Sequence, residues 1–281
     1  MSKITEKAVL VSLRISQFTG SKKDQKITKE VANNHNAQED AGSYNKRLIS
    51  KEAVGAIQTI AGKARVFHYE NTLPWSDEGS RLLPTRRYMT YVSEIKQLEF
   101  EFNSKVDEVV EKYDEIIEEA KQRRGDMFDI NEYPSKEELR KKFGFKFNIY
   151  PVPDSNDFRI SLSQHEIDKM KEEMEDNMRQ IQTNATKDIW KRLYDVVDHM
   201  AKTMKNEDKQ FQKSTVDNIK ELCEILPDLN ITEDIMLEEM RKEIVESLTK
   251  VEPDVLRTDK VLRKDIGEQA SEICRKMEAY L

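Results

Sequence analysis

Four histidines are the side chains of this sequence best suited to binding a metal ion or transferring protons. His199 has Asp195 one helical turn before it and Asp198 beside it, an arrangement that could hold a metal ion if further ligands came from elsewhere. The competing interpretation is a solvated histidine in an ion pair on a helix face, and we prefer it. His68 and His165 each have a neighbouring carboxylate but no third partner. We therefore expect no metal ion and no cofactor.

The sequence also lacks the motifs of common enzymes. It contains no glycine-rich nucleotide-binding loop, no G-x-S-x-G turn, no H-E-x-x-H and no pair of E-x-x-H segments. Cys223 and Cys274 lie 51 positions apart without a C-x-x-C motif, so we expect two buried thiols rather than a disulfide or a zinc site. The sequence thus predicts a protein that is not an enzyme. A helical metalloenzyme built on His199 is the weakest alternative.

Basic residues gather in the first third of the chain. Residues 1–90 carry an excess of six positive charges and residues 91–281 an excess of thirteen negative charges, which gives the net charge of −7. Clustered cations neutralise phosphates and aromatic rings stack on unpaired bases, so a nucleic-acid surface is one interpretation. A basic segment that docks onto acidic helices is the other. The candidate nucleic-acid contacts are Lys22, Lys23, Lys46 and Arg47.

The overall composition favours long helices. Charged residues make up 36% of the chain, whereas glycine and proline together number only 15, too few for the turns of a sheet-rich fold. The mean hydropathy is −0.79, and no apolar run approaches the ~20 residues that a membrane span needs. Arg14 interrupts the apolar stretch Ala8–Phe18, so we expect no signal peptide and a cytoplasmic protein.

The N-terminal elements follow from residue types and spacing. Ala8–Phe18 is rich in β-branched residues and predicts a strand, and Ile27–Asn33 predicts a short helix. Ser50–His68 predicts a helix with one buried stripe. Asn71–Pro84, which contains Trp75 between two prolines, predicts a linker.

Two long apolar stripes dominate the middle of the chain. One runs from Tyr88 to Ala120 and predicts a helix over Thr85–Arg123 that ends at Gly125; the other runs from Ile167 to Met204. Their matched lengths predict an antiparallel, coiled-coil-like helical hairpin.

Between them, residues 125–164 predict a small α+β tip, with a helix over Pro134–Phe143 and a β-hairpin of Phe145–Tyr150 and Phe158–Leu162. The N-terminal strand is a candidate to extend that hairpin. Three shorter helices should follow, over Asp208–Leu226, Thr232–Lys250 and Pro253–Leu281. The fold class is therefore mainly α, with domains at residues 1–84, 85–206 and 207–281.

Several stretches resemble a domain-of-unknown-function family of bacteriophage and bacterial proteins. They are Leu73–Pro84, Gly125–Asp129 with Tyr133–Phe143, and Pro151–Pro153 with Asp157–Ile160. The opening Leu13–Gly20 is similar too, with Phe18 where tryptophan is expected. Family members are encoded near MoxR-type AAA ATPases and von Willebrand factor A-like proteins, and no catalytic residues are established for them. The resemblance implies a non-catalytic component of a larger assembly, in the host cytoplasm if the chain is phage-encoded.

We therefore expect an interaction or scaffold protein that binds a second copy of itself or a protein partner, with an AAA ATPase as one candidate. The alternative is a nucleic-acid-binding protein of phage replication, repair or counter-defence. The segment around Trp75 could instead serve only to pack the basic third of the chain against a helix. The residues expected to make the interactions are Trp75, Arg81, Arg86, Arg87, Tyr150 and Phe158.

Overall fold

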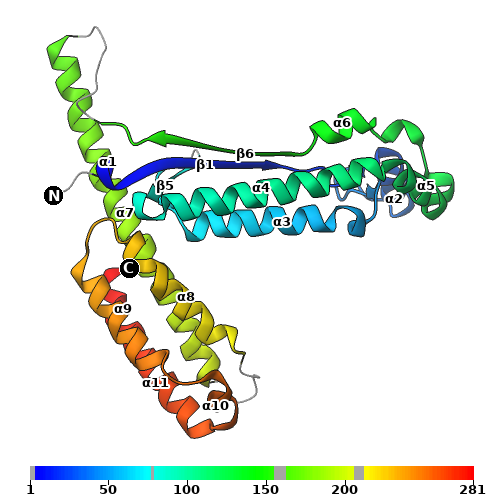
Figure 1. Ribbon diagram of the computed structural model, residues 1–281. Helices are drawn as coiled ribbons and strands as arrows, with labels where there is room; N and C mark the ends of the chain where they lie inside the picture. Colours follow the sequence, from blue (N-terminus) through cyan, green and yellow to red (C-terminus); the bar gives the residue numbers. More distant parts are fainter. Residues whose placement is uncertain (1–3, 77–78, 155–162, 206–211) are drawn as a thin grey trace. The chain divides into compact units, whose positions relative to one another are not determined.

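The computed structural model describes residues 4–76, 79–154, 163–205 and 212–281 (Figure 1). The chain is mainly α-helical and carries small antiparallel sheets. It forms two compact units, each assembled from separate segments. Unit 1 contains Met1–Ser12, Tyr69–Thr90 and Asn148–Leu281, and unit 2 contains Leu13–His68 and Tyr91–Phe147. Among the described residues, no helix combines the length and the apolar character needed to cross a membrane.

Four strands make one sheet in the order β4-β5-β1-β6. β1 (Ala8–Ser16) follows the short helix α1 (Ile4–Lys7) and confirms the predicted N-terminal strand. β6 (Gly144–Pro151) is its neighbour, so the predicted first strand of the hairpin does join the N-terminal strand. The predicted second strand of that hairpin, residues 158–162, lies outside the described residues.

The predicted linker over residues 71–84 is wrong, because it contains two strands. β4 (Leu73–Pro74) and β5 (Ser80–Pro84) pair antiparallel, and Gly79, with a φ of +86°, leads into β5. Leu73 lies opposite Leu82 and both are fully buried, so apolar burial favours the pairing. Prolines at strand ends remove few ladder hydrogen bonds, which is why they did not exclude strands here.

The helices of unit 1 pack around the second half of α7 (Gln164–Lys205). They are α8 (Ser214–Leu229), α9 (Ile235–Leu248), α10 (Pro253–Thr258), α11 (Lys260–Met277) and the 3-10 turn η4 (Glu278–Tyr280). α8 and α11 contact α7 directly, and α9 contacts both of them (Figure 1). Their apolar side chains form one core around the fully buried Leu193 and Met200 of α7.

Helix boundaries in this bundle differ from the prediction at three points. Pro227 was expected to close a helix, but α8 continues to Leu229, because a proline in the last turn removes one hydrogen bond without stopping the helix. Asp234, rather than Thr232, caps α9 by accepting backbone hydrogen bonds. Asp259 divides the predicted last helix into α10 and α11, since its side chain accepts the Leu262 amide at 2.9 Å.

The antiparallel pairing predicted between the two long apolar stripes is not confirmed. The buried side chains of α7 begin at Ala185, and they pack on α8 and α11 within unit 1. The stripe from Tyr91 to Ala120 belongs to unit 2 and is buried there. An apolar stripe specifies that a helix face must be buried, but not which element covers it.

Unit 2 contains α2 (Gln25–Asn34) and α3 (Lys51–Glu70) up to His68. It also contains the strands β2 (Ser21–Lys23) and β3 (Asn45–Arg47), which form a separate two-stranded ribbon. The predicted long helix is present as η1 (Thr85–Arg87), α4 (Tyr88–Glu111) and α5 (Tyr113–Arg124). Its first residues, up to Thr90, belong to unit 1. It is interrupted at Lys112, whose φ is −84° and ψ is 6°, and it ends at Gly125, whose φ is +51°, as predicted.

The remaining elements of unit 2 are η2 (Gly125–Met127), η3 (Ile130–Glu132) and α6 (Lys136–Lys141). Ser135 and Glu138 form a capping box at the start of α6, where the sequence predicted Ser135 as the cap. The Phe102 ring of α4 lies 5.6 Å from the Phe145 ring of β6, and both side chains are buried. Packing of the α4 stripe is therefore completed by aromatic contact with a strand.

Candidate functional site

Trp75 follows β4 and is half-buried. Its ring packs against the apolar core of unit 1. The ring therefore makes a packing contact, although with the core of unit 1 rather than with the predicted long helix, and a role in binding a partner stays a prediction. A large aromatic ring in that position stabilises the fold through the area it removes from water.

Arg81 braces the turn that precedes β4. Its Nε donates a hydrogen bond to the Thr72 hydroxyl at 2.7 Å, and its Nη2 donates one to the Thr72 carbonyl at 3.1 Å. The guanidinium group also lies over the Tyr69 ring, 4.8 Å from the ring centre, where a cation–π interaction is favourable. Arg192 of α7 donates to the same Thr72 carbonyl at 2.7 Å and forms an ion pair with Asp188 at 2.6 Å. Burial, and then the charge of Arg192, lower the pKa of Arg81. The donors of Arg81 are therefore used within unit 1, where they stabilise the β4–β5 hairpin.

Arg87 is committed in the same way, whereas Arg86 is exposed. The Arg87 Nε and Nη2 both donate to the Asn71 side-chain oxygen, at 3.0 and 2.5 Å, and its Nη1 lies 3.7 Å from Asp228. Arg86 lines a small hollow of about 60 Å³, where Lys7 and Glu233 form an ion pair at 2.8 Å. Of the three predicted arginines, Arg86 is therefore the one whose side chain is open to solvent.

Tyr150, near the end of β6, is 52% exposed and is accessible to a partner. Phe158 lies outside the described residues. The predicted interaction residues therefore divide into structural ones, Arg81, Arg87 and largely Trp75, and surface ones, Arg86 and Tyr150. The structure does not gather the two surface residues into one site, and neither was distinguishable from the others by residue type.

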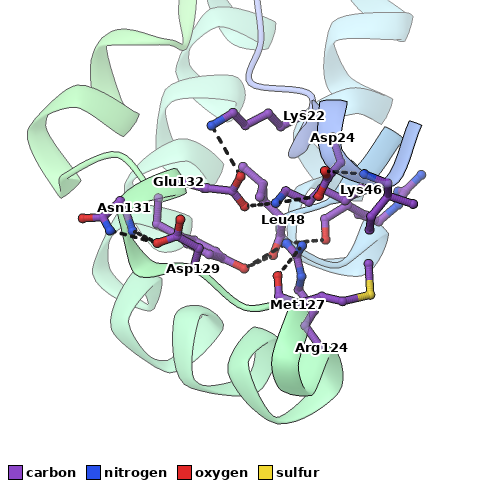
Figure 2. A network of polar contacts seen from close by, with 12 residues as sticks. Lys22, Asp24, Lys46, Leu48, Arg124, Met127, Asp129, Asn131 and Glu132 are labelled. Carbon is purple, nitrogen blue, oxygen red and sulfur yellow. Dashed lines mark hydrogen bonds and ion pairs between the residues drawn. The ribbon is translucent and has the colours of Figure 1, made fainter. Parts of the chain in front are cut away.

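The predicted phosphate contact Lys46 is not available to a phosphate. Its side chain is only 9% exposed, and its ammonium forms an ion pair with Asp24 at 3.0 Å and a second one with Glu132 (Figure 2). Burial alone would lower the pKa of Lys46, but hydrogen bonds to Glu132 and Asp24 outweigh burial and raise it. The pKa of Asp24 is lowered by the Ile27 amide and then by Lys46. This buried ion triad joins the ribbon to the α2 N-terminus and to η3.

The same network fixes the segment after α5. The Tyr133 hydroxyl donates to the Leu48 carbonyl at 2.8 Å, and Arg124 donates to the Met127 carbonyl at 3.1 Å. Asp129 accepts both the backbone and the side-chain N–H of Asn131 at 2.9 Å (Figure 2). The described contacts of this region are thus those of a structural junction within unit 2.

The other three basic candidates are exposed on the ribbon. Lys22 pairs with Lys46 across the strands, and its ammonium lies 3.5 Å from Glu132. Side chains alternate between the faces of a strand, so Lys23 and Arg47 lie on the opposite face. The ribbon therefore separates the four cations into a face neutralised by Glu132 and a solvent face with two positive charges.

A groove of about 620 Å³ lies between α3 and the α4–α5 region of unit 2. Its apolar lining is Ala53, Ala56 and Ile57 from α3 and Val109 and Ile116 from α4 and α5. Ser50, Glu52, Lys105, Glu108, Lys112, Glu115 and Glu119 complete the lining.

The groove has a simple origin in the sequence. Ala53 and Ala56 are small side chains on the flank of the α3 stripe, so α3 leaves space above Ile57. The backbone at Lys112, with φ −84° and ψ 6°, ends α4 beside this space. The sequence analysis missed the groove, because a pair of alanines beside a buried stripe is also typical of an ordinary helix surface.

The described histidines and cysteines do not gather into a metal site. The His68 Nδ1 and the Tyr91 hydroxyl lie 2.7 Å apart and are buried. Asp198, considered above as a metal ligand with His199, forms an ion pair with Lys202 at 2.6 Å. No described group of three or more histidine, cysteine, aspartate or glutamate side chains could hold a metal ion. Cys223 and Cys274 are buried free thiols, as predicted.

Residues 5–254 match the family model described as "Protein of unknown function (DUF3150)". This match covers nearly the whole chain, so the protein belongs to that family, and the resemblance to a domain-of-unknown-function family is confirmed. No curated protein and no solved structure matches the chain.

Proposed function

We propose that this chain is a non-enzymatic interaction protein that binds another protein as a component of a larger assembly. The observation that supports the proposal is the groove along α3 and the α4–α5 region. A third helix laid along the groove would remove from water the apolar side chains of its floor that are exposed or half-buried, Ala53, Ala56 and Ile116. The phage or bacterial setting and an AAA ATPase as the partner are parts of the proposal that rest on the family resemblance.

Co-purification tests this function directly. The full chain, tagged and expressed at native level, should recover one or a few proteins in near-stoichiometric amounts that mass spectrometry identifies, and an unrelated tagged protein should not recover them. Light scattering of the purified chain then reports whether it also self-associates. Recovery of no specific partner, together with a compact monomer in solution, would contradict the proposal.

Nucleic-acid binding is a second candidate, and the β2–β3 ribbon favours it. Lys23 and Arg47 share the solvent face of the ribbon, where both side chains are exposed. Replacing both with alanine should weaken retardation of DNA or RNA in a mobility-shift titration and reduce the dependence of binding on salt by roughly two phosphate contacts. Lys22→Ala is the matched control, because Glu132 lies beside that ammonium. No retardation by the wild-type chain at low salt would remove this candidate.

A further inference from the structure

We infer that the groove between α3 and α4–α5 binds a basic amphipathic helix of a partner protein. The inference rests on the proposed function and adds to it the site of contact and the chemistry of the partner. Three features of the groove carry it: its charge, its length and the size of the side chains on its floor.

The rim of the groove is acidic. Four glutamates and two lysines line it, and Lys105 is already paired with Glu108 at 2.7 Å. Glu52, Glu115 and Glu119 make no ion pair with any described residue, and Lys112 is the one remaining cation of the lining. Among the lining residues without an ion-pair partner in the described chain, carboxylates therefore outnumber ammonium groups three to one. Lysines or arginines on either side of an apolar stripe would complement this rim.

The α4–α5 side of the groove is long enough for a helix, and the α3 side, Glu52 to Ile57, contacts one end of it. The lining residues of α4 and α5 run from Lys105 to Glu119, which at ~1.5 Å per residue is about 21 Å, or four helical turns. Ala53 and Ala56 have small side chains, so they leave room for a helix backbone beside α3. The axis of a partner helix could then lie ~8–10 Å from the axis of α3, the usual distance between packed helices. Ala53, Ala56 and Ile116, which are exposed or half-buried, offer apolar contacts to side chains spaced i, i+3, i+4 and i+7, above the buried Ile57 and Val109.

A second copy of the chain is the competing occupant, and charge disfavours it. The net charge of the chain is −7, and residues 91–281 carry an excess of thirteen negative charges, so two copies would bring mostly like charges together along this rim. We therefore assign the groove to a partner of opposite charge.

The test measures binding of a synthetic helix to the full chain by fluorescence anisotropy. The probe is a labelled 15-residue peptide with leucine at i, i+4, i+7 and i+11 and lysines on both flanks, and its matched counterpart has glutamate at every lysine. We expect the lysine peptide to bind at least tenfold more tightly than the glutamate peptide. In Ala56→Arg, a large cationic side chain fills the floor and should weaken binding of the lysine peptide at least tenfold. Gln58→Arg adds the same charge at an exposed position of α3 outside the groove and should leave binding unchanged.

A second variant guards against misfolding of the first. Glu115→Gln/Glu119→Gln keeps side-chain size and should weaken binding of the lysine peptide several-fold while circular dichroism stays unchanged. Equal binding of the two peptides, or equal effects of Ala56→Arg and Gln58→Arg, would overturn the inference. A wild-type dimer that Ala56→Arg dissociates would overturn it in favour of a second copy. If Ala56→Arg still co-purifies the native partner, the proposed function stands and this site for it does not.

Discussion

Replacing Lys46 with methionine should destabilise unit 2, because two carboxylates would lose their common counter-ion. In the wild-type chain the Lys46 ammonium lies between Asp24 and Glu132, and all three side chains are largely buried (Figure 2). Methionine keeps the length and apolar stem of lysine but cannot donate a hydrogen bond. The two acids would then repel each other in a site with little water.

The structure sets the size of the expected loss. Removing one partner of a fully buried ion pair costs ~3–5 kcal/mol. Here the Asp24 and Glu132 side chains are 13% and 12% exposed to solvent. Because some solvation remains, we expect the free energy of unfolding to fall by about 2–3 kcal/mol. Urea denaturation followed by circular dichroism measures this loss. Amide hydrogen exchange at Leu48, whose N–H donates to the Gly20 carbonyl, measures the same loss locally. A loss of this size makes opening of unit 2 roughly 30- to 150-fold more frequent, and the Leu48 amide should exchange faster by the same factor.

The loss should also depend on pH in a defined direction. The pKa of Asp24 is lowered in the folded chain, so its contribution is present above its ordinary pKa and is lost as the pH falls through the folded value. The pKa of Lys46 is raised, so its contribution is present below its ordinary pKa and is lost as the pH rises through the folded value. The difference between wild type and Lys46→Met should therefore be largest near neutral pH and shrink at both extremes.

Lys22→Met provides the control. The Lys22 side chain is 53% exposed and its ammonium lies 3.5 Å from the same Glu132, so its removal should lower the free energy of unfolding by no more than about 1 kcal/mol. If Lys46→Met stays within about 0.5 kcal/mol of wild type at pH 7, or if the two variants lose equal stability, the assignment of Lys46 to a structural ion triad is refuted.

Three further predictions concern packing and the thiols. Gly20→Ala should lower the free energy of unfolding, measured by urea denaturation, by about 2 kcal/mol or more. The φ of Gly20 is +64° and the new Cβ would lie 2.5 Å from Ile49 Cγ1, so an unchanged stability would contradict this prediction. Leu193→Ala should lower the free energy of unfolding by about 2–5 kcal/mol, since the side chain is fully buried in the core of unit 1. A loss below about 1 kcal/mol would contradict this prediction. Burial raises the pKa of Cys223 and Cys274 to about 11. Both thiols should therefore react with a soluble aromatic disulfide at pH 8 far more slowly in the native chain than in the chain unfolded by guanidinium, and equal rates would contradict their burial.

Apolar spacing predicted the helices well. The α3 stripe and the limits of α7 follow directly from residues that recur every three or four positions, because that spacing places them on one buried face. The ends were predicted where a residue has one local role, as with Ser135 at the start of α6 and Gly125 at the end of α5. Where Pro227 and Thr232 were expected to mark ends, neighbouring packing and Asp234 decided the boundaries instead.

Long-range partners could not be predicted in the same way. Lys46 has the sequence neighbours of a surface lysine, and the carboxylate of Glu132, 86 positions later, is brought to it only by the fold of unit 2. Arg81 and Arg87 were predicted to bind a partner, but Thr72 and the Asn71 side-chain oxygen, which directly precede β4, accept their hydrogen bonds. The groove depends on two alanines and on the end of α4 at Lys112, none of which marks a site in the sequence.

Site-specific photo-cross-linking in the cell tests the central claim most directly. A photoreactive phenylalanine analogue placed at Ala56, on the floor of the groove, should form an adduct with a lysine- or arginine-rich helical segment of another protein. The same residue placed at Gln58, outside the groove, should not form that adduct. No adduct from position 56, or the same adduct from both positions, would contradict the account of this chain as an interaction protein that binds its partner in the groove.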